Sequence, residues 1–417
     1  MHTTDTGKEC CSSQSKTVKI SGALALAIIL AAGIHSVFFS PGTQHDFRVY
    51  YFSASASRLG LDPYKVETLT KLSGVKSQFA YVYPPITLYI FYPFTWFNLH
   101  VASRGWLMLK VASVGLLALI WHHLFHLFTD KRAWLLVLIP IAFNASLMRD
   151  LLPGNVSTFE QLLIWSGFYC YLRGWRSMFG LLIILAALCK IVPILFLGFL
   201  ALRLRRRDII IMLVSGLLFA GIFFLNRFLW PALDAQFMHL AFAMPASQDE
   251  RGIVNPCTFA ACQDAMQWIA NQAKLNIPHV ASVAMYLVVA CVAGLISLGA
   301  IRRLHSVNDE TADLLRICLF CFLYAIVMPR FKDYSYILLI APSLYILVYS
   351  RWINYLIPCC LLLIFWYFEP WETLGNPLQA LYQIGSQYYC LWLAWALWAI
   401  CVANIYRYSD EYPTPTS

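Results

Sequence analysis

The chain has 417 residues, of which 60% are hydrophobic and 12% are charged, and its formal net charge is +9. Soluble globular domains contain about 25% charged residues, so this composition excludes an ordinary water-soluble globule. Apolar runs of about 20 residues recur along the chain, which is the length that a helix needs to cross a bilayer. Backbone polar groups must be satisfied inside lipid, and the runs do not alternate as barrel strands do. We therefore expect an all-α polytopic membrane protein.

Hydropathy predicts about twelve transmembrane helices, several of them shorter than a full crossing, as tilted, broken or re-entrant segments are. The first span is too long for the apolar core of a signal peptide and lacks a small-residue cleavage site after it, so we expect it to be retained. The expected spans are 18–39, 83–99, 104–128, 133–148, 156–172, 177–200, 209–229, 279–301, 314–329, 334–350, 353–368 and 387–406.

Basic residues predict the orientation of these spans, because lysine and arginine concentrate on the cytoplasmic side of a membrane. The strongest clusters are at 203–207 and 302–303. Counting outward from them predicts a multi-pass protein of the inner (plasma) membrane with both termini in the cytoplasm. The expected parts are a tail at 1–17, a transmembrane domain at 18–406 with outer loops at 40–82, 230–278 and 369–386, and a tail at 407–417. Basic residues in the first loop and at 131–132 oppose this count, so the topology of 100–175 stays open. The positive charge is explained by topology or by anionic headgroups, and does not indicate nucleic acid.

The 13 cysteines show no metal-site signature, since no CxxC pair has a second pair or a histidine set at zinc spacing. Most lie in apolar spans, where they behave as small apolar residues. Cys257 and Cys262 lie instead in the expected outer loop 230–278. A disulfide between them is one hypothesis, because that side of the membrane is oxidising, and two free thiols are the other.

Asp46 has the most specific setting of the candidate site residues. It closely follows the first span, beside aromatic residues and Arg48. A carboxylate just outside the bilayer can serve as the general base of an enzyme that acts on a lipid-borne substrate. An ordinary solvated loop residue is the alternative.

An amphipathic helix on the membrane surface is expected directly after Asp46. Gly60 and the sequence Asp-Pro-Tyr at 62–64 then predict a stop and a turn. The apolar stripe of the helix consists of Phe47, Tyr50, Tyr51, Ala54 and Leu59. The next tyrosines fit an aromatic belt at the interface, which is the simpler interpretation, or contacts with a substrate. They are Tyr81, Tyr83, Tyr89 and Tyr92.

Three cations are further candidates. Lys190 lies well inside an apolar run, where an ionisable group usually faces a partner or a watery cavity. Snorkelling along a tilted helix is the alternative. Arg330 and Lys332 lie between two spans at the expected outer face, where they suit a lipid phosphate or simply flank a span. Arg149 and Asp150 are interpreted as a paired charge at a span end.

The order and spacing of these pieces resemble the GT-C glycosyltransferases, and most closely family 87, the polyprenyl-phosphate-mannose-dependent mannosyltransferases. In that family an early Asp of the first outer loop is followed by aromatics, a Gly-x-x-Pro-Tyr turn and a Tyr- and Pro-containing helix start. This chain has Asp46, then Gly-Leu-Asp-Pro-Tyr at 60–64 and Tyr-Pro-Pro-Ile at 83–86.

A later segment of the family carries a Gly-Gln-x-Asn element and a Lys-x-x-Pro helix that ends in arginines. Lys-Ile-Val-Pro at 190–193 and the basic run at 203–207 match this segment. Gly154 and Asn155 match only in part, because the Gln is absent. The resemblance covers most of the first 210 residues and fades in the second half, apart from 332–342.

The resemblance implies a GT-C bundle with one active site at its extracytoplasmic face. The donor would be a sugar, mannose in that family, on a polyprenyl phosphate. The acceptor hydroxyl would belong to a lipid-linked or cell-envelope glycan or a glycolipid. No cofactor is implied, and the chain has neither a G-x-G-x-x-G nor a Walker signature. Asp46 would be the general base of an inverting transfer. The donor phosphate would be bound by Lys190, Arg330, Lys332 and Arg48. The substrates would contact Tyr50, Tyr51, Tyr64, Tyr81, Tyr83 and Asn155.

Three other functions are weighed against this hypothesis. A lipid or solute transporter or flippase would need charges or broken helices paired across repeats, and Lys190 has no obvious twin. A lipid-linked glycan polymerase or ligase is also built around outer loops, although such enzymes resemble one another in a large late loop. A scaffold would not need a buried lysine.

Overall fold

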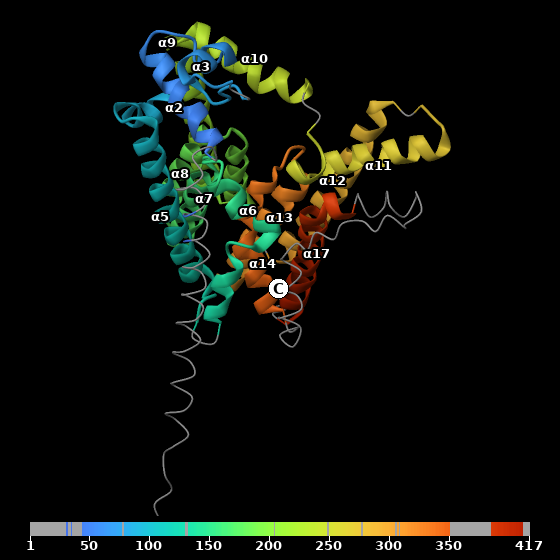
Figure 1. Cartoon of the computed structure of the whole chain (residues 1–417). Helices are drawn as coiled ribbons and strands as arrows, with labels where there is room; N and C mark the ends of the chain where they lie inside the picture. The colour runs from blue at the N-terminus through green and yellow to red at the C-terminus, as the bar shows by residue number, and fades with distance from the viewer. Residues whose placement is uncertain are drawn as a thin grey trace, which may run out of the picture. The chain divides into compact units, whose positions relative to one another are not determined.

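A computed structural model describes most of the chain between residues 44 and 411, and all regular structure in that part is helical (Figure 1). The all-α prediction is confirmed there. The expected span 353–368 lies outside the described residues, as do nearly all of the first span and of the outer loop 369–386. The described residues are 31, 35, 44–76, 79–129, 132–203, 205–247, 250–276, 278–304, 307, 309–350 and 385–411.

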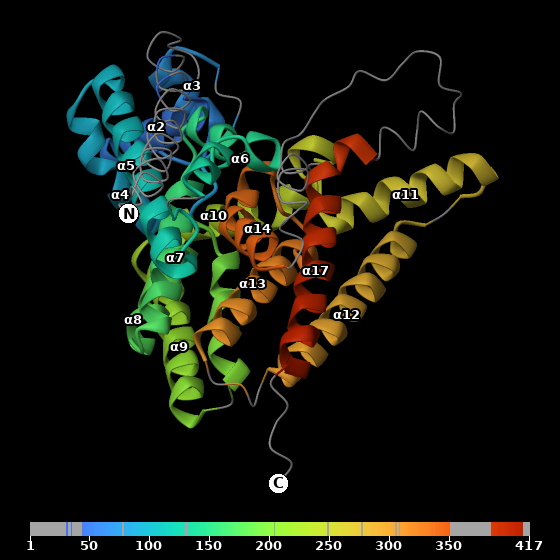
Figure 2. The ribbon, with the colours of Figure 1, turned by 90° about the horizontal axis from the view of Figure 1, so that it is seen from below.

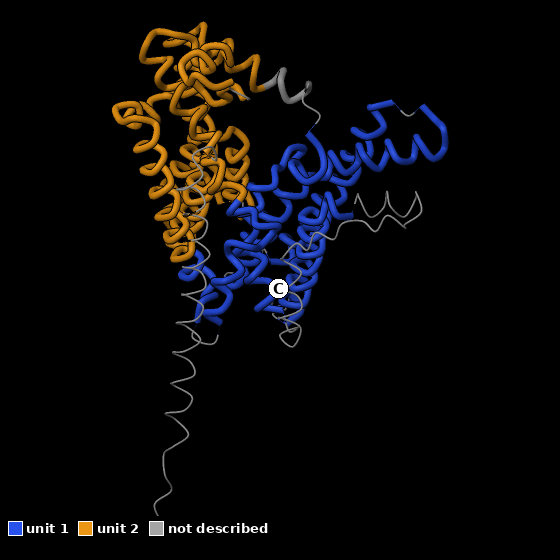
Figure 3. Tube along the Cα trace, viewed as in Figure 1, with its two compact units in different colours: residues 1–29, 121–148, 250–417 blue, residues 30–120, 149–249 orange. Residues whose placement is uncertain are grey.

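The chain divides into two compact units, which Figure 3 colours separately. Unit 1 comprises residues 1–29, 121–148 and 250–417, and unit 2 comprises residues 30–120 and 149–249.

Unit 2 contains the helix that carries Asp46. In chain order its elements are α2 (His45–Arg58), α3 (Val66–Ser73), η1 (Pro85–Thr87), α4 (Leu88–Phe91), η2 (Tyr92–Trp96), most of α5 (Leu99–Phe125), α7 (Ser157–Leu172), α8 (Arg176–Cys189), η4 (Val192–Arg203), α9 (Arg206–Leu229) and α10 (Pro231–Ser247). Helix α8 packs between α7 and α9, and α8 and α9 run side by side (Figure 2).

The helix expected after Asp46 is α2, and its place on the membrane surface stays a prediction. Its buried face includes Phe47, Tyr50 and Ala54, as the apolar stripe predicts. Leu59 is the exception, because it caps the helix end and is 64% exposed. Phe47 stacks on Trp106 of α5 with ring centroids 5.4 Å apart, so α2 is attached to a membrane-length helix by aromatic packing.

Unit 1 is a second helical bundle. Its elements are η3 (Ala133–Leu138), α6 (Ala142–Leu151, of which 149–151 belong to unit 2), η5 (Gly252–Val254), α11 (Thr258–Ala273), α12 (His279–Arg303), α13 (Glu310–Val327), η6 (Asp333–Tyr336), α14 (Ile337–Tyr349) and α17 (Tyr389–Glu411). Helix α13 packs against α12, α14 and α17 (Figure 2).

Four helices among the described residues are long and apolar enough to cross a membrane, namely α5, α9, α12 and α17. Shorter apolar helices include α8, η4 and the segment Asp333–Tyr349. Large apolar side chains cover the outside of α9, where Phe228 is 83% exposed. Such a surface is costly in water and is typical of contact with lipid. The count of about twelve spans stays a prediction.

Three expected spans are broken in the structure, and one of them, 133–148, is divided between η3 and α6. The span 83–99 consists of the short helices η1, α4 and η2, because prolines at 84, 85 and 93 remove backbone donors and block a continuous helix. The span 177–200 ends as an α-helix at Cys189, and Lys190 has an extended backbone conformation before η4 begins. This break places Lys190 at a helix end.

Candidate active site

Asp46 lies in the first turn of α2, where a negative charge interacts favourably with the helix dipole. The backbone N–H groups of Asp46 and Phe47 donate to the carbonyl oxygen of Pro153, at 2.9 and 3.3 Å. The chain just before α7 therefore satisfies the unpaired donors that begin α2. The Asp46 side chain is 21% exposed, so its carboxylate is held by the protein and still accessible.

Asn155 holds the Asp46 carboxylate. Its Nδ2 donates to Asp46 Oδ2 at 2.7 Å, across 109 residues of sequence. Its Oδ1 accepts from the backbone N–H and the hydroxyl of Ser157, at 3.1 and 2.9 Å, which fixes the orientation of the amide. Asn155 is almost fully buried. The residue expected to contact a substrate thus makes its side-chain contacts inside the protein.

Gly154 is required by the close approach of this turn to α2. Its φ is +78°, in the left-handed region that favours glycine, and a Cβ added there would lie 2.9 Å from the Cβ of Phe47. The partly matching Gly-Asn pair is therefore explained by geometry: the glycine lets the turn approach α2, and the asparagine bonds to Asp46.

Lys110 and Asp150 form a second, fully buried part of the network. Lys110 Nζ of α5 lies 2.7 Å from Asp150 Oδ2, and both side chains are 0% exposed. The same ammonium donates to the backbone carbonyls of Asp150 and Asn155, each at 2.5 Å. The sequence suggests Arg149 as the partner of Asp150, but in the structure the Asp150 carboxylate is bonded to Lys110. Sequence reasoning missed Lys110, although it too lies inside an expected span, 104–128.

Lys190 does have polar partners. Its Nζ lies 3.0 Å from Glu160 Oε2 and donates to the Ser157 hydroxyl. Because Ser157 donates to Asn155, a continuous hydrogen-bonded path joins Lys190 to Asp46. Glu160 was also missed, and a carboxylate inside the expected span 156–172 was the available signal. The lysine expected to lack a twin therefore lies in the same unit as another lysine paired with a carboxylate, Lys110.

Arg48 lies two residues after Asp46 on α2 and is half-buried. Residues two apart on a helix do not face each other. Within the described residues its side chain makes no recorded hydrogen bond or ion pair, so it remains a candidate cation on another face of α2.

The expected substrate-binding tyrosines have internal hydrogen-bond partners. The hydroxyls of Tyr50 and Tyr83 are 2.9 Å apart, and Tyr64 donates to the Tyr83 carbonyl at 2.7 Å. Tyr51 donates to the Phe97 carbonyl at 2.8 Å, and Tyr81 bonds to Thr87 at 2.6 Å. Burial raises the pKa of Tyr64, so this phenol stays neutral.

The belt interpretation is wrong for two of the later tyrosines. Tyr81 is 0% exposed and Tyr83 is 9% exposed, because both pack in the aromatic core around α2. These tyrosines position α2, and through it Asp46.

Arg330 and Lys332 share a carboxylate within unit 1. Glu250 Oε2 lies 2.6 Å from Arg330 and 3.0 Å from Lys332. Burial alone would raise the pKa of Glu250, but bonds and charges from Lys332 and Arg330 outweigh it and lower the pKa. The triplet has one positive charge more than it has negative charges, which suits an anion.

The family model of glycosyltransferase family 87 matches residues 81–329, which is more than half of the chain. The chain belongs to glycosyltransferase family 87. It is therefore a glycosyltransferase of the GT-C superfamily and a multi-pass membrane protein, which acts on a sugar donor and an acceptor. None of the curated proteins compared with the chain matches it. The match begins after Asp46, so helix α2 lies outside the matched residues.

The cysteine pair of this transferase is not bonded. Cys257 and Cys262 are both free, and the disulfide hypothesis is wrong for the structure. Cys257 is the N-cap of α11 and donates to the Pro329 carbonyl at 2.9 Å. Cys262 lies five residues along the helix, and a rise of about 7.5 Å exceeds the Cα separation of about 7 Å that a disulfide spans.

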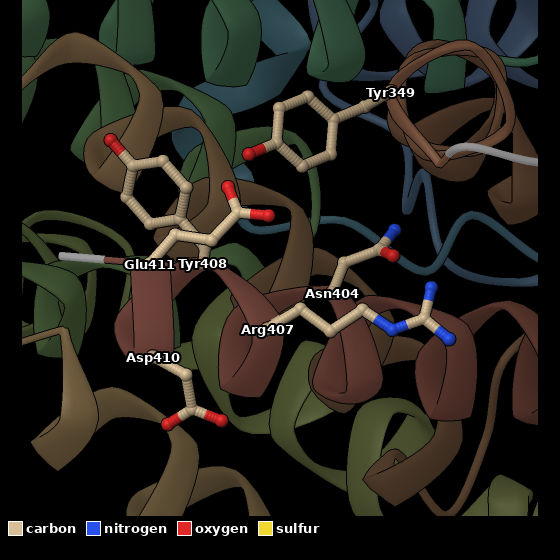
Figure 4. A pocket seen from close by; sticks show the side chains of 6 residues that line it. All are labelled: Tyr349, Asn404, Arg407, Tyr408, Asp410 and Glu411. Carbon is tan, nitrogen blue, oxygen red and sulfur yellow. The ribbon is translucent and has the colours of Figure 1, made fainter.

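Unit 1 contains a hollow of about 630 Å³, which is lined by none of the candidate site residues (Figure 4). Its lining comes from the ends of α14 and α17 and carries both signs of charge: Tyr349, Asn404, Arg407, Tyr408, Asp410 and Glu411. No group of three His, Cys, Asp or Glu side chains among the described residues is placed to hold a metal ion.

Proposed function

We propose that this family 87 transferase moves a sugar, mannose by its resemblance, from a polyprenyl-phosphate donor to a hydroxyl of a lipid-linked or cell-envelope glycan. The reaction takes place at the extracytoplasmic face of the membrane. The observation that carries the proposal is Asp46: an accessible carboxylate at a helix start, held by Asn155 and connected to Lys190.

Asp46 acts as the general base in this proposal. The acceptor hydroxyl oxygen attacks the anomeric carbon, and its proton passes to the Asp46 carboxylate. The bond from the anomeric carbon to the phosphate oxygen breaks, and the polyprenyl phosphate leaves with the electron pair. One displacement without a covalent enzyme intermediate inverts the anomeric configuration, as in the inverting glycosidases.

Lys190 is the cation that best fits the leaving phosphate. The phosphate gains negative charge as it leaves, and a fixed cation stabilises that charge most in a water-poor site. Within unit 2, hydrogen bonds lead from Lys190 through Ser157 and Asn155 to Asp46. Arg330 and Lys332 are a second candidate pair, since their triplet keeps an excess positive charge.

The transporter alternative is weakened by the same contacts. Lys110 and Lys190 are each paired with a carboxylate inside unit 2. Such pairs hold charged groups in fixed positions, whereas a transporter needs repeated elements that alternate around a binding site.

Asp46→Asn tests the assignment of the base, because the amide keeps the shape but cannot accept a proton at neutral pH. Initial rates with a labelled polyprenyl-phosphate sugar in vesicles are expected to fall at least about 100-fold, with donor binding retained.

Asp62→Asn is the matched control. Asp62 Oδ1 accepts from the Tyr64 N–H at 3.0 Å and so serves a turn, which Asn also supports. Near-normal transfer by Asp46→Asn, with loss in Asp62→Asn, would move the base to Asp62 and sink the assignment.

A further inference from the structure

Lys110 is a fully buried cation in a mostly apolar helix. It lies in the apolar helix α5, and its side chain is 0% exposed. A charge at that depth is costly unless it is paired and hydrogen-bonded. The contacts of this lysine are therefore informative about what it does.

The ammonium of Lys110 joins the two ends of one turn. A lysine has three N–H donors. Here they face three acceptors: Asp150 Oδ2 at 2.7 Å, and the carbonyl oxygens of Asp150 and Asn155 at 2.5 Å each. Both carbonyls belong to the 150–155 turn, so the position of this turn depends on a side chain 40 residues earlier.

The carboxylate of Asp150 holds the other side of the turn. Its Oδ1 accepts from the Ser157 N–H at 3.2 Å. Its Oδ2 accepts from the Thr158 N–H at 3.1 Å and from the Thr158 hydroxyl. These are donors at the start of α7 that have no partner within the helix. Lys110 and Asp150 together thus lock the turn to α5 and to α7.

The locked turn is the part of the chain that holds Asp46. Pro153 accepts from the backbone of Asp46, and Asn155 donates to its carboxylate. The Gly154 carbonyl accepts from Trp106 Nε1 at 2.8 Å, which ties the same turn to α5 once more. Movement of the turn by a fraction of an ångström would move the amide that orients the base.

We infer that Lys110 is a positioning residue for the transfer reaction, and that its buried pair with Asp150 holds Asn155, and through it Asp46, in the reactive geometry. This inference rests on the proposed function, in which Asp46 is the general base. Lys110 itself contacts neither substrate nor the reacting atoms in this scheme.

The first experiment compares turnover of full-length wild type with Lys110→Met and with Lys110→Met/Asp150→Asn in vesicles. The single change leaves the Asp150 charge buried and unpaired, which alone can prevent folding. The double change removes both charges. The amide oxygen of the introduced asparagine replaces one of the two carboxylate oxygens that accept hydrogen bonds at the start of α7, so the helix cap is kept in part.

The double variant is expected to be more stable than Lys110→Met, because it leaves no charge unpaired, and less stable than wild type, because two buried carbonyls lose their donor. Its kcat should fall about 10- to 100-fold, since small misplacements of catalytic groups have effects of this size. The donor KM should change less than about twofold, because no donor contact is removed. A folded double variant with wild-type kcat would overturn the inference, because the pair would then be structural only.

The second experiment tests the route through Asn155. Asn155→Ala is combined with the double variant in a cycle. If the pair acts through Asn155, adding Asn155→Ala to the double variant should lower kcat little further. Fully additive losses would contradict this route.

Arg316→Met is the matched control in unit 1. Arg316 is also a buried cation that pairs with an aspartate, Asp313, and binds two backbone carbonyls, those of Leu304 and Val307. Its loss should lower stability and leave kcat within about twofold. An equal loss of kcat in this control would show a general effect of removing buried cations, and would also overturn the inference.

Asp46→Asn separates the two possible failures. Normal transfer by Asp46→Asn would overturn the proposed base. Loss of transfer in Asp46→Asn with normal kcat in the folded double variant would overturn only the role of Lys110.

Discussion

Two clusters of cations and carboxylates, one in each unit, differ in their burial and in their balance of charge. In unit 2, two lysines pair with carboxylates, and the Lys110–Asp150 pair is 0% exposed. In unit 1, Arg330 and Lys332 share the single carboxylate of Glu250, and their side chains are 37%, 24% and 26% exposed. In the first cluster, Lys110 binds backbone carbonyls and Asp150 binds the start of α7, so this pair holds geometry. Lys190 of the same cluster is 24% exposed and is the proposed phosphate ligand. The second lies nearer the surface with an excess positive charge, so it can still attract an anion.

The comparison shows that a cation's partners are more informative than its position in the sequence. By sequence, Lys190, Arg330 and Lys332 are equivalent candidates for the donor phosphate. The contacts within each unit differ. Hydrogen bonds within unit 2 lead from Lys190 to Asp46, whereas Arg330 and Lys332 bind Glu250 within unit 1.

The largest loss of kcat in this comparison of the two clusters is expected for Lys190→Met, which tests whether Lys190 binds the donor phosphate. Loss of a charge-assisted contact to the leaving phosphate corresponds to about 1.5–3 kcal/mol, or roughly a 10- to 150-fold lower kcat. Rates are measured with labelled donor in vesicles. The matched control is Arg330→Met/Lys332→Met, with an expected change of no more than about threefold. A reversed order of the two effects would assign the phosphate to the unit 1 triplet.

An intermediate effect is expected for Gly154→Ala, which disturbs the backbone of the first cluster without altering a charge. The new Cβ would lie 2.9 Å from Phe47, and φ is +78°. Crowding and strain of this kind cost about 1–3 kcal/mol each. We expect lower thermal stability together with reduced transfer.

Gly174→Ala is the control for this backbone strain. Its φ is +82°, and nothing lies within 4 Å of an added Cβ. It should lose about 1–2 kcal/mol of stability from φ alone and retain normal transfer. Equal losses of transfer in both variants would mean that the contact of Gly154 with α2 is unimportant.

The smallest effect is expected for Glu250→Gln and concerns pH. The folded state lowers the pKa of Glu250, so the carboxylate stabilises the fold fully above its unfolded pKa of about 4.3. This stabilisation is lost as pH falls through the lowered folded pKa. Below pH 4 the free energy of unfolding of wild type should therefore fall by about 1 kcal/mol or less. The variant lacks this ion pair at every pH, so it should show no such fall. Thermal unfolding from pH 3 to pH 7 measures the difference, and parallel curves for both proteins would contradict the ion-pair role of Glu250.

Local patterns predict some elements and misjudge others for identifiable reasons. The apolar stripe after Asp46 predicts α2, because side chains on one helix face recur with a fixed period. The belt interpretation fails for Tyr81 and Tyr83, since a tyrosine in a core and one at an interface have the same sequence signature. The disulfide hypothesis fails because Cys257 is the N-cap that begins α11, and cysteine is not a typical capping residue that would reveal a helix start there.

The sequence by itself determined that the chain is helical and embedded in a membrane, and that Asp46 and Lys190 needed an explanation. Periodicity and the cost of burying charge act over a few residues and can be read along the chain. The tertiary structure decided the partners. Asn155 reaches Asp46 across 109 residues, and Lys110 reaches Asp150 across 40. Such contacts depend on how distant helices pack, because a buried charge is satisfied by whichever partner the fold brings to it, and no local pattern names that partner.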